Sequence, residues 1–291
     1  MVQLPYRTLD VFTDTRFGGN PLAVVLGADA LATAEMQAVA REFGYSETTF
    51  VCAPGDPAHD AKVRIFTPTF EMPFAGHPNV GTGWVLAGET GKDRLVFEEI
   101  AGLVPIAVTR ENGRMTAVSV SAPEPLSVGE TGSVETVAET IGLAPEDIET
   151  DVHAPCTASV GAAFTVVELA SRDALKRMQV ADTDKLASLG GLAAIYAYVR
   201  DADGADISAR MIFDADGLRE DPATGSATAA CAALIHSLTG ETGLVFAQGV
   251  DMGRASRIRT RVDERGVTIG GACVSVMSGT ITVRGRSSAG P

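Results

Sequence analysis

The chain has 291 residues, of which 45% are hydrophobic and 21% charged, and its formal net charge is −14. This composition is typical of a globular protein with enough apolar residues for one large domain or two ordinary ones. The negative charge argues against a nucleic-acid partner, because phosphates would be repelled. No apolar run approaches the ~20 residues that span a bilayer, and no signal-peptide pattern precedes the first strand. We therefore expect a cytoplasmic protein that binds neither nucleic acid nor membranes.

The cysteines give no sign of a disulfide framework or a metal site. The chain has four of them, with no CxxC pair and no histidine at metal-ligand spacing: Cys52, Cys156, Cys231 and Cys273. In a chain of this size, reduced thiols are the default. The sequence therefore predicts no bound metal. It also lacks a complete dinucleotide-binding glycine motif and a GKS or GKT phosphate loop, so no other cofactor is predicted.

Strand signals dominate the first part of the chain. Short segments rich in β-branched or aromatic residues predict strands at residues 9–12, 22–26, 48–52, 62–66, 95–98, 104–109 and 116–121. Pro105 suggests that the strand at 104–109 lies at a sheet edge. One amphipathic helix is predicted at residues 33–43, with Gly44 just beyond its end.

The composition changes at residues 122–127 (APEPLS), which we interpret as a linker. Beyond it, helices are predicted at residues 133–141, 174–178 and 184–189. Further strands are predicted at 162–169, 193–200, 208–213, 257–262, 267–269, 274–277 and 279–283, and the last of them is expected to return to the first domain. Strands and helices do not alternate regularly, so a Rossmann sheet is not expected.

A Gly/Pro-punctuated motif occurs once in each half, at residues 74–79 (FAGHPN) and 220–227 (EDPATGSA). Each opens into an apolar stretch, which predicts a buried helix that begins near Pro78 or Pro222. The start of such a helix offers unpaired N–H groups and a partial positive charge. Two of these starts would make a cleft suited to an anion such as a carboxylate.

Several polar residues near these motifs have two interpretations. Asn20 lies in a turn and serves either that turn or a substrate through its amide. Glu47 is either a solvated loop residue or, if buried in a cleft, a group suited to proton transfer. His77 either satisfies backbone groups or acts as an acid/base.

The second motif leaves the same alternatives open. Asp221 before Pro222 is a typical N-cap, although one carboxylate oxygen can cap while the other faces a ligand. Gly225 would let a substrate approach the main chain, and Ser226 adds a hydroxyl, but both residues also suit an ordinary turn. No nucleophile elbow is present that would make Ser226 a nucleophile.

Taken together, these segments resemble the PhzF family of phenazine-biosynthesis isomerases. The resemblance is carried by residues 10–13, 17–21, 46–50, 66–68, 73–78, 220–227, 248–249 and 253–254. It implies an α+β fold similar to diaminopimelate epimerase, in which two pseudo-symmetric domains each wrap a mainly antiparallel sheet around a central apolar helix. We expect residues 1–122, completed by 278–291, to form the first domain and 123–277 the second.

The resemblance also implies a function. Family members isomerise dihydro-hydroxyanthranilate by a proton shift without a cofactor, at a site between the domains, and they are homodimers. Glu47 would be the acid/base, assisted by His77 and Asp221. Asn20, Gly76, Gly225 and Ser226 would bind a small anionic substrate.

Two other functions remain open from the sequence. Epimerases of this fold use a cysteine at each helix start, but these positions hold 76–77 (GH) and 224–225 (TG) here, so two-thiol racemisation is disfavoured. Asn79 stands where many relatives have Thr, which bears on substrate identity. The third possibility is a non-catalytic relative that binds a small anion.

Overall fold

The computed structural model describes residues 1–180, 182–214 and 217–284. The chain divides into two compact units: unit 1 is Met1–Val120 with Gly271–Pro291, and unit 2 is Ser121–Gly270. The sequence placed the return to the first domain at 278, whereas it lies at Gly271, because the last strand pairs with the first from Cys273 onward. Residues 285–291 of that expected segment lie outside the described residues.

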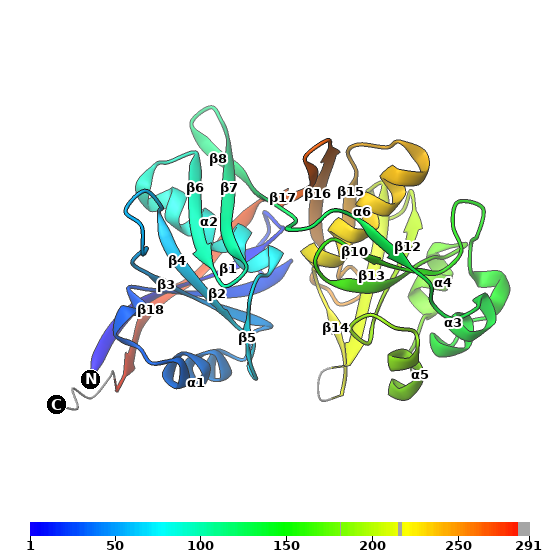
Figure 1. Ribbon diagram of the computed structural model, residues 1–291, viewed down its shortest axis with the longest axis horizontal. Helices are drawn as coiled ribbons and strands as arrows, with labels where there is room; N and C mark the ends of the chain where they lie inside the picture. Colours follow the sequence, from blue (N-terminus) through cyan, green and yellow to red (C-terminus); the bar gives the residue numbers. More distant parts are fainter. Residues whose placement is uncertain (181, 215–216, 285–291) are drawn as a thin grey trace. The chain divides into compact units, whose positions relative to one another are not determined.

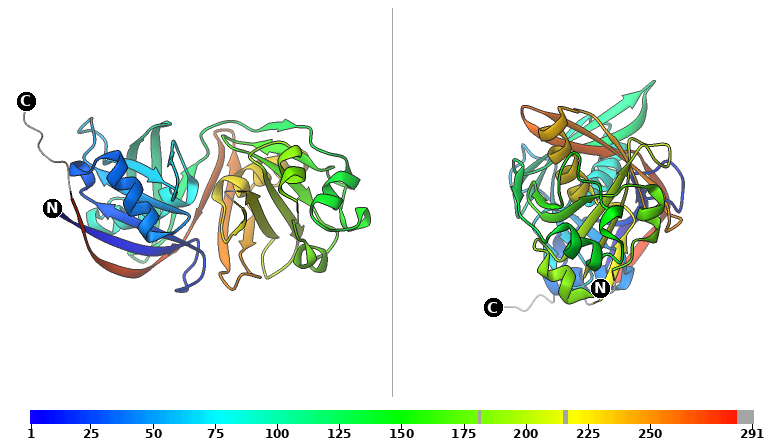
Figure 2. Two further views of the ribbon diagram at one scale, coloured as in Figure 1. Left: turned by 90° about the horizontal axis from the view of Figure 1, so that it is seen from below. Right: turned by 90° about the vertical axis from the view of Figure 1, so that its right-hand side faces the viewer.

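Unit 1 is built from a single run of paired strands. In chain order these are β1 (Val2–Val11), β2 (Asn20–Leu26), β3 (Glu47–Cys52), β4 (Ala61–Phe66), β5 (Glu71–Met72), β6 (Arg94–Glu99), β7 (Gly102–Glu111), β8 (Arg114–Ser121) and β18 (Cys273–Val283). The pairings are antiparallel except β2 with β3 and β4 with β6, which are parallel. In Figure 2, β18 (red) follows β1 (blue), so the two ends of the described chain lie side by side.

Two helices cover opposite faces of this sheet. α2 (Gly76–Thr90) contacts β1, β2, β3, β6 and β7, so the strands surround it (Figure 1). A Cβ on Gly81 would lie 2.4 Å from Leu22 Cδ2, so glycine lets α2 approach β2 closely. α1 (Thr33–Phe43) packs with Val25, three residues from Leu22 and hence on the other face.

Unit 2 has the same plan. Its strands are β9 (Ser127–Gly129), β10 (Cys156–Ser159), β11 (Ala163–Glu168), β12 (Ala194–Arg200), β13 (Ile207–Asp214), β14 (Leu218–Asp221), β15 (Val245–Gln248), β16 (Ser256–Asp263) and β17 (Gly266–Gly271). Its helices are α3 (Val134–Thr140), α4 (Arg172–Arg177), α5 (Thr183–Ser188) and α6 (Gly225–Thr239). Short 3₁₀ turns at Ala28–Ala30 and Pro145–Asp147 complete the assignment.

The strand order of unit 2 repeats that of unit 1. β11 and β12 are parallel like β2 and β3, and β13 pairs antiparallel with β14 and parallel with β15, as β4 does with β5 and β6. α6 corresponds to α2: each has 15 residues and ends at a glycine in the left-handed conformation, Gly91 or Gly240. The predicted α+β fold with two pseudo-symmetric halves is therefore confirmed.

Some local predictions were wrong. The buried helices begin at Gly76 and Gly225 rather than at the prolines, because Ala75 and Thr224 have the extended conformation of N-cap residues. β7 is an interior strand; it tolerates Pro105 because its ladder with β8 begins one residue later, at Ile106. The helix at Thr33–Phe43, ended by Gly44, is confirmed.

None of the helices in the described residues combines the length and apolarity that crossing a membrane requires.

Candidate active site

Glu47 and His77 meet in unit 1. Glu47 is the first residue of β3, and His77 is the second residue of α2. The Glu47 Oε2 to His77 Nδ1 distance is 3.3 Å, and the two side chains are 16% and 6% exposed. The two residues are 30 positions apart in the chain, so the fold, and not local sequence, makes this pair.

His77 is neutral near pH 7. Burial lowers the pKa of its imidazole to about 3, and a hydrogen bond to the main chain of Pro21 opposes this only in part. Proline has no N–H, so the ring donates this bond to the Pro21 carbonyl. His77 Nε2 has no hydrogen-bond partner among the described residues, which favours the tautomer with its proton on Nδ1. The contact with Glu47 is therefore a polar contact and not a pair of opposite charges.

A buried hydrogen bond fixes how α2 lies along β3. The hydroxyls of Thr49 and Thr82 are 2.8 Å apart, and both residues are fully buried. Thr49 is two residues after Glu47 and so projects to the same face of β3. A shift of α2 along β3 would break this hydrogen bond. The bond therefore keeps His77 beside Glu47.

Asn20 and Gly76 lie at neighbouring element starts in unit 1. Asn20 begins β2 and is fully buried, and its Oδ1 accepts a hydrogen bond of 2.9 Å from the Ser46 hydroxyl. Because β2 and β3 are parallel, their first residues lie at the same end of the sheet. Gly76 follows Ala75, an N-cap residue whose side chain cannot accept a hydrogen bond.

In unit 2, Asp221 ends β14 and does not cap the helix, so the N-cap interpretation was wrong. The N-cap residue is Thr224, whose hydroxyl donates a 2.5 Å hydrogen bond to Asp221 Oδ2. That hydroxyl is thereby drawn away from the helix, and within the described residues no side chain caps α6. Gly225 and Ser226 are its first two residues, so Ser226 occupies the position of His77 in α2.

Gln248 holds this second helix start in place. Its Oε1 accepts from the Thr224 N–H at 3.1 Å, and its Nε2 donates to the Asp221 carbonyl at 2.7 Å and to Thr224 Oγ1 at 3.0 Å. The next residue, Gly249, has φ +72°, and a Cβ there would lie 2.6 Å from the Pro222 carbonyl. Sequence patterns assign Gln248 and Gly249 no role of their own. The signal that could have found them is a glutamine directly before a glycine at the end of a short apolar segment.

Glu99 is a further polar residue that sequence reasoning missed. It ends β6, and both its carboxyl oxygens are buried without a hydrogen-bond partner among the described residues, as is Asn79 Oδ1. Burial raises the pKa of Glu99 to about 8, an effect that the Asn79 side chain partly offsets. Glu99 and Gln248 occupy corresponding positions in the two units. Phe97 pairs with the first residue of β4, and Glu99 lies two positions after it. In the same way, Phe246 pairs with the first residue of β13, and Gln248 lies two positions after it.

Each helix start thus gathers the predicted residues of its own unit: Asn20, Glu47, Gly76 and His77 in unit 1, and Asp221, Gly225 and Ser226 in unit 2. Uncapped N–H groups at both helix starts suit an anion. Among the described residues, no three His, Cys, Asp or Glu side chains come together as a metal site would require.

Comparison with known proteins identifies relatives of the whole chain. The model of the PhzC-PhzF family, described as phenazine biosynthesis-like protein, matches residues 9–279. An uncharacterised isomerase from Mesorhizobium japonicum is 39% identical, over 96% of this chain and 98% of its own length. The trans-2,3-dihydro-3-hydroxyanthranilate isomerase of Pseudomonas aeruginosa is 35% identical, over 93% and 94% of the two chains.

Solved structures agree with these matches. The Bacillus anthracis phenazine biosynthesis protein of the PhzF family has a TM-score of 0.86, with 26% identity, over 97% of this chain and 100% of its own. A hydroxyproline epimerase from Agrobacterium vitis shares the fold alone, with a TM-score of 0.62 and 14% identity over 96% and 92%. The family match and the identity to named isomerases lead to one conclusion: the chain belongs to the PhzC-PhzF, phenazine biosynthesis-like family and is an isomerase.

Proposed function

We propose that this isomerase moves a proton on a small carboxylate substrate similar to trans-2,3-dihydro-3-hydroxyanthranilate, with Glu47 as the general acid/base. The observation that carries the proposal is the pairing of Glu47 with a buried, neutral His77 at the start of α2. A carboxylate in a largely dry setting is suited to removing a proton from carbon. The 35% identity to an isomerase named for that substrate supports the substrate class.

The proposed reaction balances with one carboxyl group. The Glu47 carboxylate removes a proton from a carbon next to a conjugated system, and the electron pair of the broken C–H bond shifts the double bond. The carboxylic acid that results returns the proton to another carbon on the same face. The substrate is neither oxidised nor reduced, so the step consumes no redox cofactor. His77 Nδ1 lies 3.3 Å from Glu47 Oε2, but its proton is donated to the Pro21 carbonyl, so the neutral ring places no positive charge beside the carboxylate.

The remaining residues would bind the substrate. In the proposed roles, the uncapped N–H groups at a helix start, near Gly76 or near Gly225, hold the substrate carboxylate. Asp221 assists the proton transfer, and Asn20 and Ser226 form hydrogen bonds with polar groups of the substrate. The bare helix starts and the fixed position of Asp221 beside Thr224 support these assignments.

Proton exchange in D2O tests the proposal. The protein is incubated with trans-2,3-dihydro-3-hydroxyanthranilate, and deuterium incorporation at carbon is followed by NMR. We expect exchange and double-bond migration with wild type. In Glu47→Gln, which keeps the shape but cannot accept the proton, kcat should fall by about 10²–10⁴-fold.

The comparison needs a folded variant, so the thermal midpoint of Glu47→Gln is measured beside wild type. A Gln variant with wild-type turnover would refute Glu47 as the base. Inversion at one carbon without movement of a double bond, seen with cyclic amino acids, would instead identify an epimerase.

A further inference from the structure

Two arginine–glutamate pairs have the same geometry in the two units. In unit 2, Arg210 Nε donates to Glu220 Oε1 at 2.9 Å and its NH2 to Oε2 at 2.8 Å. In unit 1, Arg64 Nε donates to Glu71 Oε1 at 2.6 Å and its NH2 to Oε2 at 2.6 Å. Both are two-pronged contacts, the strongest and most directional form of this pair.

The two pairs occupy corresponding places in the internal repeat. Residues 71–76 (EMPFAG) and 220–225 (EDPATG) both run from a short strand into the start of a central helix. Phe66 pairs with Glu71 and Ile212 with Glu220, and each arginine lies two residues before that partner, on the same face of its strand. The chain has thus retained the same contact ahead of each helix start.

In unit 2 this contact holds Glu220, the residue directly before Asp221. Neighbouring residues on a strand project to opposite faces, so a Glu220 side chain held by Arg210 sends Asp221 to the other face. There the carboxylate accepts the hydrogen bond from Thr224 Oγ1, and the Asp221 carbonyl accepts from Gln248. Loss of this two-pronged contact would allow β14 to twist, and Asp221 would then turn away from Thr224.

Each arginine also forms hydrogen bonds with a further helix. These bonds restrict the motion of each arginine–glutamate pair, which we call a clamp. Arg64 NH2 donates to the hydroxyl of Thr33, the first residue of α1, at 3.0 Å. Arg210 NH1 donates to the carbonyls of Leu175 and Met178 at the end of α4, each at 2.9 Å. Carbonyls at a helix C-terminus attract cations, so the site suits an arginine.

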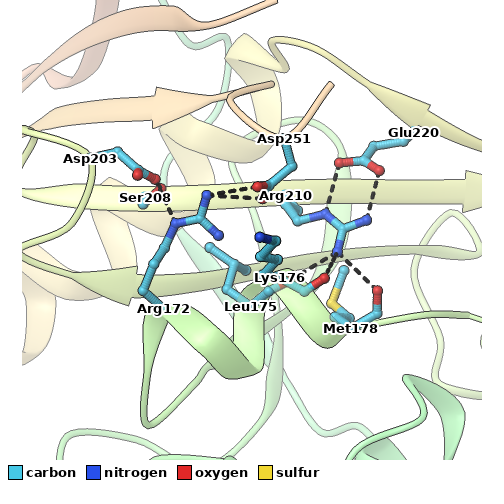
Figure 3. A network of polar contacts seen from close by, with 9 residues as sticks. All are labelled: Arg172, Leu175, Lys176, Met178, Asp203, Ser208, Arg210, Glu220 and Asp251. Atoms are coloured by element: carbon cyan, nitrogen blue, oxygen red, sulfur yellow. Dashed lines mark hydrogen bonds and ion pairs between the residues drawn. The ribbon is translucent and has the colours of Figure 1, made fainter. Parts of the chain in front are cut away.

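Figure 3 shows that unit 2 has a second support next to the first. Arg172, which begins α4, donates to Asp203 at 2.7 Å and to Asp251 at 3.0 Å. Asp251 lies two residues after Gly249, whose backbone packs against the Pro222 carbonyl. The segment from the end of β14 into the turn at Pro222 is thus supported by contacts with β13 and with the loop after β15.

We propose that Arg210, through Glu220, is a positioning residue that orients Asp221 for the isomerase reaction, and that Arg64 and Glu71 do the same for the turn that carries His77. This inference rests on the proposed function of Asp221 and His77. The pairs touch neither residue's reacting atoms, so their effect on turnover is indirect.

The test compares Arg210→Lys with Arg177→Lys. Lysine keeps the positive charge but cannot form the two-pronged contact with a carboxylate. Arg177 is a matched control, because it lies on α4 and also contacts two carboxylates, Asp147 and Asp173, but none in the turn. We expect Arg210→Lys to lower kcat by about 10–100-fold with little change in KM, since a small misplacement suffices for such a loss. Arg177→Lys should keep wild-type kcat at a similar thermal midpoint.

A double-mutant cycle separates a clamp from two independent effects. If Arg210 acts through Glu220, Arg210→Lys combined with Glu220→Gln should lower kcat no further than the more impaired single variant. Additive losses would overturn the proposal. A folded Arg210→Lys variant with wild-type kcat would also overturn the proposal. The same holds if the variant is less stable than wild type but keeps its kcat.

A spectroscopic measurement keeps this outcome distinct from failure of the proposed function. Amide NMR shifts of residues 221–226 should change in Arg210→Lys and stay unchanged in Arg177→Lys. If wild type shows no proton exchange, the proposed function fails, and these shifts alone decide whether Arg210 orients Asp221; unchanged shifts would refute the clamp.

Discussion

At the scale of single residues, burial sets the protonation of the two titratable groups beside the start of α2, and in opposite ways. It keeps the His77 imidazole uncharged, with a pKa of about 3, and it favours the neutral acid of Glu99, with a pKa of about 8. Both groups are thus uncharged at pH 7. A negative substrate approaching α2 would meet a neutral imidazole and a neutral acid there, so neither adds a charge that repels it.

For His77, the pKa shift predicts a ring that stays neutral at every pH well above 3. The unfolded chain takes up a proton near the usual pKa of 6.5 and the folded chain only near 3, so this residue's contribution to stability is lost as the pH falls between these values. NMR titration, with the ring signals assigned from His77→Asn, should show no His77 midpoint near pH 6.5. A midpoint there would mean that water reaches the imidazole.

For Glu99 the sign is reversed. The folded state retains the proton up to about pH 8, whereas the unfolded chain loses it near 4.5, so stability decreases as the pH rises between these values. We expect Glu99→Gln to remove this dependence. The thermal midpoint of wild type relative to the Gln variant should therefore fall steadily over that range. Parallel midpoint curves would show that Glu99 ionises normally in the folded protein.

At the scale of elements, the central helices depend on close contact with strands. Gly81 of α2 lies against Leu22 of β2, and Gly83 lies against β7, where a Cβ would be 2.7 Å from Ile106 Cγ2. The packing role of Gly81 and Gly83 could not be predicted from the sequence, because a glycine's neighbours in space are set by the sheet. With Thr49 and Thr82, these glycines fix the height and distance of α2 against the sheet, and hence the position of His77.

Two glycines of the same helix give a matched test of this packing. Alanine at 81 would clash with Leu22, so Gly81→Ala should lower the free energy of unfolding by about 1–3 kcal/mol. Gly88 is exposed, and a Cβ there would lie 4.0 Å from Met115 Cε. Gly88→Ala should therefore stabilise the protein by roughly 0.5–1 kcal/mol through helix propensity. Urea unfolding measures the free energy of unfolding of both variants. If the two substitutions changed it by the same amount and in the same direction, close packing at Gly81 would be refuted.

At the scale of the whole molecule, unit 1 is assembled from both ends of the chain. β1 pairs with β18 along nearly its full length, with one register shift between Thr8 and Leu9. Unit 2 is continuous in sequence, and its outer pairing, β9 with β10, is short. Homodimerisation and a cytoplasmic location stay predictions from the sequence, and light scattering would test the first of them.

This architecture predicts an unequal response to truncation. Deletion of residues 271–291 removes β18 and leaves one edge of β1 unpaired, so hydrogen exchange should accelerate in β1 while unit 2 keeps its protection. Deletion of only 285–291 leaves β18 intact and is the control. Equal loss of protection in both units would show that they unfold as one.

The sequence by itself determined the family and the α+β class, and it supplied the candidate site residues. These follow from local patterns that survive without coordinates: the two Gly/Pro motifs before apolar stretches, the amphipathic period of residues 33–43, and the short β-branched runs. Only the tertiary structure decided which residues meet. The contact of Glu47 with His77, the support of Thr224 by Gln248 and the clamps of Arg64 and Arg210 all join different elements. Such contacts depend on strand register and on how closely a helix approaches a sheet. Both are set by packing over the whole unit, so no local segment of the sequence records them.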